Sequence, residues 1–256
     1  MQSRQIAGLT LFYAPEEQAA AEIIAPACSR SIELIPRMWG LRPPQDCRVH
    51  VMTGWFSFIF QSFPWPLKIL YAATIPLWAG RVQRTWAIAG GWTFRAGRRT
   101  VVGVKPARLL EAADRSIGET IFNKIDPIEN KIAGITAHEL THAHTLPLRL
   151  PAWMSEGMAM LTADRLLGLD TVKPETRSAL ADEDKLKTYP AVTIPFIRGY
   201  WLTRYLLETQ PAFFSDWSAY PARAKILEEE IAGLLSVNPQ TFWKEAGALV
   251  AAYFTP

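Results

Sequence analysis

The sequence predicts an α+β protein with a small mixed β-sheet lobe over residues 1–167 and a helical lobe over residues 168–256. Strand patterns fall only in the first half of the chain, and helical patterns fill most of the rest. A polar stretch over residues 168–195 is expected to be a loop or hinge between the lobes. With 256 residues, 49% of them hydrophobic, the chain is long and apolar enough to bury a full core.

The first lobe is expected to begin with an amphipathic helix over residues 16–38, where apolar side chains recur at helical spacing. Trp39-Gly40 ends that helix. Strands are predicted over residues 48–52, 86–88 and 100–104, with a turn near Ala96-Gly97 between the last two.

Helices are expected over most of the second half of the chain. The predicted helical ranges are 106–125, 127–145, a helix that begins near Pro151, 196–208, 222–235 and 239–253. Proline is well tolerated in the first turn of a helix, so Pro151 suits a helix start. Zinc is expected between the two lobes.

The most informative stretch is His138-Glu139-Leu140-Thr141-His142, on the helix predicted over residues 127–145. Two histidines four residues apart lie on one helical face, so both imidazoles can reach one metal ion. Catalytic Zn²⁺ takes three N, O or S ligands from the protein and keeps a fourth position for water. Glu156, just after a turn bounded by proline, is the expected third ligand. Glu139 is expected to act as a general base toward water at the metal.

This motif and the segment over residues 150–159, which reads Leu-Pro-Ala-Trp-Met-Ser-Glu-Gly-Met-Ala, resemble the gluzincin clan of zinc metallopeptidases, the thermolysin-like group. The segment is similar to that of the peptidase MA-like members in particular. Residues 86–92 and 99–104 resemble the strand pair that those proteins place beside the active-site cleft. The resemblance covers about residues 86–165 and implies a gluzincin-like fold that hydrolyses peptide bonds with water, without a covalent intermediate. We expect the strand over residues 100–104 to pair with an extended peptide or protein substrate.

The metzincin pattern is excluded, because it needs a glycine and a histidine where this chain has Thr145 and Leu148. His144 points away from the metal face and is expected to be a surface histidine or one that supports a ligand.

Two supporting positions stay open. Thermolysin-like enzymes carry an aspartate four residues after the glutamate ligand, and this chain has Met160 there. Asp164 or a backbone carbonyl is the candidate replacement. Tyr200 is the candidate catalytic donor to the oxyanion of the tetrahedral intermediate. The alternative for Tyr200 is ordinary packing in an aromatic helix.

Residues 47–110 contain no Asp or Glu but nine Lys or Arg, whereas the whole chain has a net charge of only +3. Within this segment, residues 49–80 hold eight aromatic residues and are divided by Pro64, Pro66 and Pro76, so no transmembrane helix is expected. Three interpretations remain: a peripheral membrane contact, a core strand over residues 49–60 followed by a hydrophobic lid, or a self-association surface. Nucleic-acid binding is not expected, because the aromatic residues lie apart from most of the arginines and no recognition motif occurs.

Cys28 and Cys47 are too few for a disulfide framework, and no signal peptide is evident at the N-terminus. A cytoplasmic location is therefore expected, with membrane association as the open alternative, and the sequence does not indicate an oligomeric state. Two other functional classes stay open beside a zinc metallopeptidase. They are a non-catalytic zinc domain and a peripheral membrane module that acts through residues 49–80.

Overall fold

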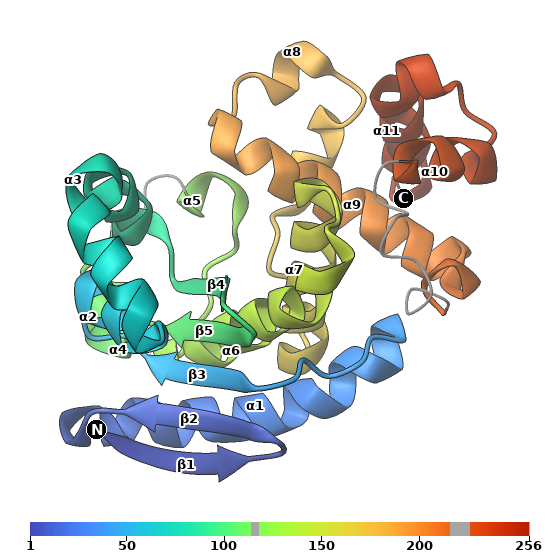
Figure 1. Cartoon of the computed structure of the whole chain (residues 1–256). Helices are drawn as coiled ribbons and strands as arrows, with labels where there is room; N and C mark the ends of the chain where they lie inside the picture. Colours follow the sequence, from blue (N-terminus) through green and yellow to red (C-terminus); the bar gives the residue numbers. More distant parts are fainter. Residues whose placement is uncertain (114–117, 216–225, 256) are drawn as a thin grey trace.

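The computed structural model describes residues 1–113, 118–215 and 226–255, apart from the side chains of residues 66, 67 and 71 (Figure 1). It is a mixed α/β structure in which a five-stranded sheet lies in the N-terminal part and helices follow. One buried hydrophobic cluster extends from Ile6 in the first strand to Val250 in the last helix. The division into lobes at residue 167 stays a prediction.

The sheet has the strand order β1-β2-β3-β5-β4. Its strands are β1 Gln2–Ile6, β2 Leu9–Tyr13, β3 Cys47–Val51, β4 Gly91–Ala96 and β5 Arg99–Val104. The pairs β1–β2 and β4–β5 are antiparallel, and β3 pairs in parallel with both β2 and β5. The sequence did not predict the β1–β2 hairpin. Because β5 is paired on both sides, the expectation that it receives a substrate strand is wrong, and β4 is the edge strand on that side of the sheet.

Helices cover both faces of the sheet near this edge (Figure 1). Helices α1 (Gln18–Trp39) and α6 (Ile128–Thr145) lie on one face. Helices α2 (Trp55–Ser62) and α3 (Trp65–Ile88) contribute side chains to a separate cluster that covers residues of β4 and β5. Thr93 contacts α6, whereas its neighbour Phe94 packs on Phe58 and Phe63 of the second cluster. Alternate side chains of β4 therefore face two different helical layers.

Two strand predictions in this region are wrong. Strand β3 ends at Val51 and residues 55–62 are helical, so no core strand spans residues 49–60. Residues 86–88 are the last turn of α3, and the strand begins at Gly91. Trp78, Val82 and Trp86 all pack on the second cluster, and their spacing of four is that of one helical face. Aromatic content favoured a strand, but burial of this face determines a helix.

Of the other helices, four follow the predicted ranges in the described part of the chain: α7 Ala152–Leu167, α9 Ile194–Thr209, α10 Leu227–Leu235 and α11 Phe242–Tyr253. Three short helices do not: α4 Ala107–Glu111, α5 Gly118–Ile121 and α8 Glu183–Leu186. The helix predicted over 106–125 is two short helices, and residues 114–117 between them lie outside the described residues. The start of the helix predicted over 222–235 lies outside them as well. The predicted hinge contains α8 and two 3-10 helices, at residues 174–179 and 191–193.

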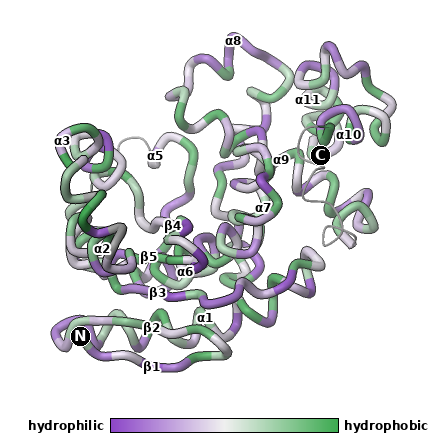
Figure 2. Tube along the Cα trace, viewed as in Figure 1, coloured by the Kyte–Doolittle hydropathy of each residue, from purple (hydrophilic) through white to green (hydrophobic). Residues whose placement is uncertain are grey.

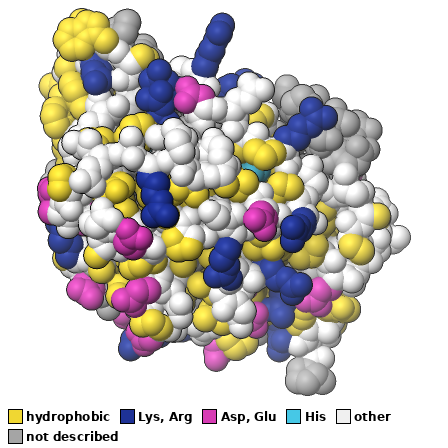
Figure 3. Space-filling model, turned by 90° about the horizontal axis from the view of Figure 1, so that it is seen from below, with side chains coloured by type: hydrophobic (Ala, Val, Ile, Leu, Met, Phe, Trp, Pro, Cys, Tyr) yellow, Lys and Arg dark blue, Asp and Glu magenta, His cyan; other side chains and the backbone are white. Residues whose placement is uncertain are grey.

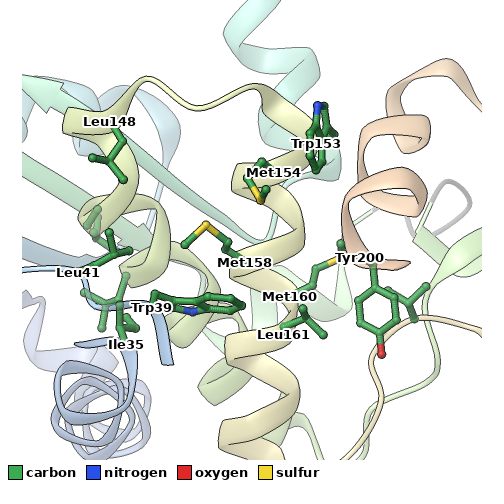
Figure 4. Close-up of a cluster of buried hydrophobic side chains, with 14 of the residues drawn as sticks. Ile35, Trp39, Leu41, Leu148, Trp153, Met154, Met158, Met160, Leu161 and Tyr200 are labelled. Atoms are coloured by element: carbon green, nitrogen blue, oxygen red, sulfur yellow. The ribbon is translucent and has the colours of Figure 1, made fainter. Parts of the chain in front are cut away.

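Helix α7 is packed closely against its neighbours (Figure 4). Trp39 of α1 donates a buried hydrogen bond of 2.8 Å from Nε1 to Thr162 Oγ1 on α7. On the other side, Gly157 of α7 meets Gly199 of α9, where a Cβ added at either position would overlap the backbone of the other helix. This glycine contact fixes the position of the residue before Gly157, which is Glu156.

In the described part of the chain, no helix combines the length and the hydropathy that crossing a bilayer requires.

His50 on β3 gives a test of the packing between the sheet and α2. The ring stacks on Phe12 at 5.0 Å and meets the edge of Phe58 at 5.9 Å, and Nε2 has no hydrogen-bond partner among the described residues. Burial, helped by Arg48, lowers the pKa of His50 from 6.5 to about 4. Between these two values the unfolded chain binds the proton more tightly, so stability rises with pH and is lost as pH falls through the window.

Wild type should therefore lose about 2 kcal/mol of unfolding free energy through His50 between about pH 7 and pH 4.5. His50→Phe keeps an aromatic ring but cannot titrate, so its loss over the same range should be smaller by about that amount. Urea denaturation at the two pH values measures both. Equal pH dependence in the two proteins would contradict a buried neutral His50.

Candidate metal centre

Helices α6 and α7 bring together three groups that could hold a metal ion. His138 and His142 lie one turn apart on α6, and Glu156 lies in the second turn of α7. The two histidine Nε2 atoms are 3.0 Å apart. Glu156 Oε2 lies 3.2 Å from Nε2 of His138 and 3.4 Å from Nε2 of His142. The structure thus gathers the three residues that the sequence suggested as ligands.

A short connection determines this arrangement. Helix α6 ends in a 3-10 turn, Leu146–Leu148, and Arg149 then adopts a left-handed backbone conformation with φ of 51°. Pro151 in an extended conformation precedes the first turn of α7, where its lack of an N–H costs no helical hydrogen bond. The chain therefore reverses within a few residues and returns Glu156 to the histidine face of α6.

The donor atoms fit zinc. Ligand atoms about 2.0–2.1 Å from a tetrahedral ion lie about 3.3 Å from one another, and the three distances here are 3.0, 3.2 and 3.4 Å. Glu156 Oε2 is buried, and the Nε2 atoms of His138 and His142 are its polar neighbours. The three side chains stay about one-fifth exposed, so water can reach the group. Two imidazoles and one carboxylate are a donor set used by catalytic zinc sites.

The pKa values of Glu156 and His142 depend on the charged groups around them. Burial raises the pKa of the Glu156 carboxyl, but hydrogen bonding and attraction from the two histidines outweigh burial and hold that pKa below its ordinary value. Burial lowers the pKa of His142, and the carboxylates of Glu156 and Glu139 reverse the effect and raise it. An ionised Glu156 is the form that ligates a cation.

Glu139 lies against the edge strand β4. Its Oε2 is 2.7 Å from the hydroxyl of Thr93, which is also 2.9 Å from the backbone oxygen of Glu139. A Cβ added at Gly91 would lie 2.7 Å from Oε1 of Glu139 and closer still to its Cγ. Only glycine at residue 91 leaves room for this carboxylate. Sequence reasoning missed both strand residues, although the pair Gly90-Gly91 before a strand was a signal of a close backbone approach.

Ser155 supports the second histidine. Its Oγ lies 2.9 Å from Nδ1 of His142 and 3.3 Å from the hydroxyl of Thr145. When Nε2 of a histidine ligates a metal, the proton is on Nδ1, so His142 would then donate its Nδ1–H to Ser155. Sequence reasoning missed Ser155 and suggested Asp164 or a backbone carbonyl instead.

Asp164 has other partners and does not support a histidine. Its carboxylate accepts hydrogen bonds from the Thr171 amide and the Tyr200 hydroxyl, both at 2.8 Å. Burial raises the pKa of Asp164 to about 6 despite these bonds. Asp164 lies eight residues after Glu156, which is about 12 Å along the axis of α7. That separation places it outside the metal group.

The structure does not bring Tyr200 to the three ligands. Tyr200 is fully buried, its hydroxyl donates to Asp164, and it accepts a hydrogen bond of 3.0 Å from Arg204. Figure 4 shows the Tyr200 ring beside α7 near Met160 and Leu161, with the hydroxyl pointing away from Met154. Tyr200 therefore fits the alternative in which it packs between helices.

His144 is a buried residue and not a surface histidine. Its Nδ1 donates a 2.8 Å hydrogen bond to the Leu140 carbonyl oxygen one turn earlier. Burial lowers its pKa and outweighs the opposing effect of this hydrogen bond, so the neutral imidazole is favoured. It is not among the residues that form the metal group.

Comparisons with protein-family models, with curated proteins and with solved structures gave no match to this chain.

Removing the Ser155 hydroxyl tests its role in orienting His142. Ser155→Ala should lower zinc affinity by about tenfold to a hundredfold, because the imidazole loses the partner that fixes its tautomer and ring angle. Competition with a chromophoric chelator measures the affinity. Ser178→Ala, which removes an exposed hydroxyl from a 3-10 helix distant in sequence, is the matched control. If both variants bind zinc as tightly as wild type, Ser155 does not orient the ligand.

Proposed function

We propose that this protein is a zinc-dependent metallopeptidase that hydrolyses peptide bonds with water. The observation that carries the proposal is the group of His138, His142 and Glu156, whose donor atoms lie 3.0 to 3.4 Å apart beside the carboxylate of Glu139. The resemblance of the motif to gluzincins supports the same function.

In this proposal His138, His142 and Glu156 hold Zn²⁺. A bound zinc ion supplies Lewis acidity, which polarises a substrate carbonyl and lowers the pKa of water. The remaining chemistry belongs to Glu139. Its nearly buried carboxylate accepts a proton from the attacking water and then delivers it to the leaving amine. Thr93 holds one carboxylate oxygen, so the geometry needed for proton transfer is fixed in advance.

Strand β4 offers a docking place for the substrate backbone. Because β4 is at the edge of the sheet, an extended peptide can add to it through main-chain hydrogen bonds. Thr93 of this strand contacts Glu139 directly. A peptide aligned along β4 would therefore pass close to the proposed general base. This assigns to β4 the role that the sequence suggested for residues 100–104.

A non-catalytic zinc domain is the main competing function. Such a domain needs the three ligands but has no use for a carboxylate that β4 holds beside them. The specific contacts of Glu139 with Thr93 and Gly91 favour the enzyme.

Metal content and turnover test the proposal together. Wild type should carry about one zinc ion per chain, and Glu156→Ala should lose most of it, by elemental mass spectrometry. Glu139→Gln should keep the zinc but lose turnover of a peptide library by about a hundredfold to ten-thousandfold, because the general base is gone. Glu129→Gln, at an exposed glutamate on the same helix, should change neither.

Zinc content without any turnover in wild type would favour the non-catalytic domain. A wild-type protein that binds no zinc after incubation with Zn²⁺ would overturn the proposed function.

Gly91 provides a second test of the contact between β4 and Glu139. In Gly91→Ala the new methyl group must displace the Glu139 side chain or the strand, so turnover should fall by at least about tenfold while zinc content is kept. Gly233→Ala adds a methyl group where no atom lies within 4 Å, and serves as the control. Full activity of Gly91→Ala would show that the position of Glu139 does not depend on β4.

A further inference from the structure

Over residues 65–80, helix α3 carries hydrophobic residues around most of its circumference, but the protein covers only one side of the helix. The covered side consists of Trp78, Val82 and Trp86, which pack on the cluster above the sheet. The uncovered side carries four large hydrophobic residues, defined here as the outer face of α3. These are Trp65, Ile69, Leu70 and Leu77, with exposed fractions of 73%, 59%, 59% and 86%. A helix that is apolar all round normally has every side covered, by protein or by lipid.

The outer face is continuous along the first part of the helix. Among the side chains that the structure describes between residues 65 and 80, the other exposed ones on α3 belong to the uncharged Ala72, Ala73, Pro76 and Gly80. Sixteen helical residues span about 24 Å. Lys68, the only charged residue in this stretch, is only partly exposed. Phe56 of the preceding helix α2 is also exposed and stacks on Phe60 at 4.7 Å. Exposed apolar surface of this extent marks an interaction site.

Positive charge follows the outer face directly. Arg81 and Arg84 are both exposed, one and two turns after Leu77 on the same helix. Residues 47–110 as a whole carry nine basic and no acidic residues. Figure 2 shows hydrophobic segments along α3, and Figure 3 shows hydrophobic side chains gathered at the corner where α2 and α3 lie, with basic side chains beside them.

We propose that the outer face of α3 docks onto an anionic phospholipid membrane, with the helix lying in the plane of the interface. The apolar side chains enter the boundary between headgroups and acyl chains, and Arg81 and Arg84 contact the anionic headgroups. Trp65 at the start of the helix is a residue type that membrane interfaces favour. The inference concerns binding alone and does not depend on the proposed peptidase function.

Charge distinguishes this occupant from a second copy of the chain. A symmetric dimer through the outer face would bring the same basic residues of two copies together without any acidic residue of this segment to pair with them. An anionic surface offers the complementary charge. An anionic membrane can therefore contact both the apolar residues and the basic residues of this surface.

Membrane docking of α3 would also affect strand β4, which contacts Glu139 beside the candidate metal centre. Helix α3 ends at Ile88, and only Ala89 and Gly90 separate it from β4. The strand that contacts Glu139 would then begin a few residues from the membrane surface. Substrate segments close to a membrane would be presented to the edge of the sheet.

Vesicle co-sedimentation tests the proposal. Full-length protein should bind phosphatidylcholine vesicles that contain phosphatidylserine much more tightly than vesicles of phosphatidylcholine alone, and high salt should weaken the binding. Ile69→Ser with Leu77→Ser should reduce the affinity at least about tenfold, because the apolar anchor is removed. The matched control is Val192→Ser with Leu234→Ser, which changes exposed apolar residues elsewhere.

Arg81→Gln with Arg84→Gln should reduce binding to the anionic vesicles about thirtyfold and flatten the salt dependence. Arg37→Gln with Arg165→Gln, at exposed arginines on α1 and α7, should leave binding unchanged. Failure of wild type to bind anionic vesicles, or equal losses in the control variants, would overturn the proposal. A dimer in sedimentation velocity that the Ile69/Leu77 variant disperses, without vesicle binding, would show that a second copy covers this face instead.

Discussion

The placement of helix α7 is the constraint on which the candidate metal centre depends. On one side α7 returns to α6 through a short turn, and on the other Gly157 meets Gly199 of α9 without any side chain between the backbones. A methyl group at either glycine would push the two helices apart, and Glu156 would move with α7. Metal ligands tolerate errors of only about 0.2 Å in ligand distance. The contact between Gly157 and Gly199 therefore sets the distance from Glu156 to the two histidines, although neither glycine is a candidate ligand.

Local sequence determined the helices of this centre, and the sequence predicted them for that reason. The spacing of His138 and His142 defines one face of a helix, and Pro151 indicates where the next helix begins. The long helix α1 follows from its apolar periodicity. Such features depend on neighbours within four residues, so one sequence is sufficient to recognise them. Helices α2 and α3 were harder to predict from the sequence. A run of apolar and aromatic residues is compatible with a strand and with a helix, and the choice depends on which side chains become buried.

The hydrogen-bond partners of the candidate site residues depend on tertiary structure and were not predictable from spacing. Thr93 reaches Glu139 only because β4 pairs with β5 beside α6, and no local pattern encodes that register. Ser155 reaches His142 across the turn between two helices. Asp164 and Tyr200, both suggested from their position in the sequence, bind each other instead. Residue type and spacing identified candidates, but only the three-dimensional neighbours decide which hydrogen bonds form.

Strand β4 links the two surfaces to which we assign functions. Side chains alternate along a strand, so Gly91 and Thr93 face Glu139 on α6 while Trp92 and Phe94 belong to the cluster under α3. Lys105, next to this strand, binds the Trp86 carbonyl oxygen with its ammonium group and so attaches the end of α3 to the sheet. An edge strand has hydrogen-bonded support on one side only, so its position depends strongly on the layers above and below it. Anything that holds α3 in place, including a membrane, would therefore also restrict the strand that positions Glu139.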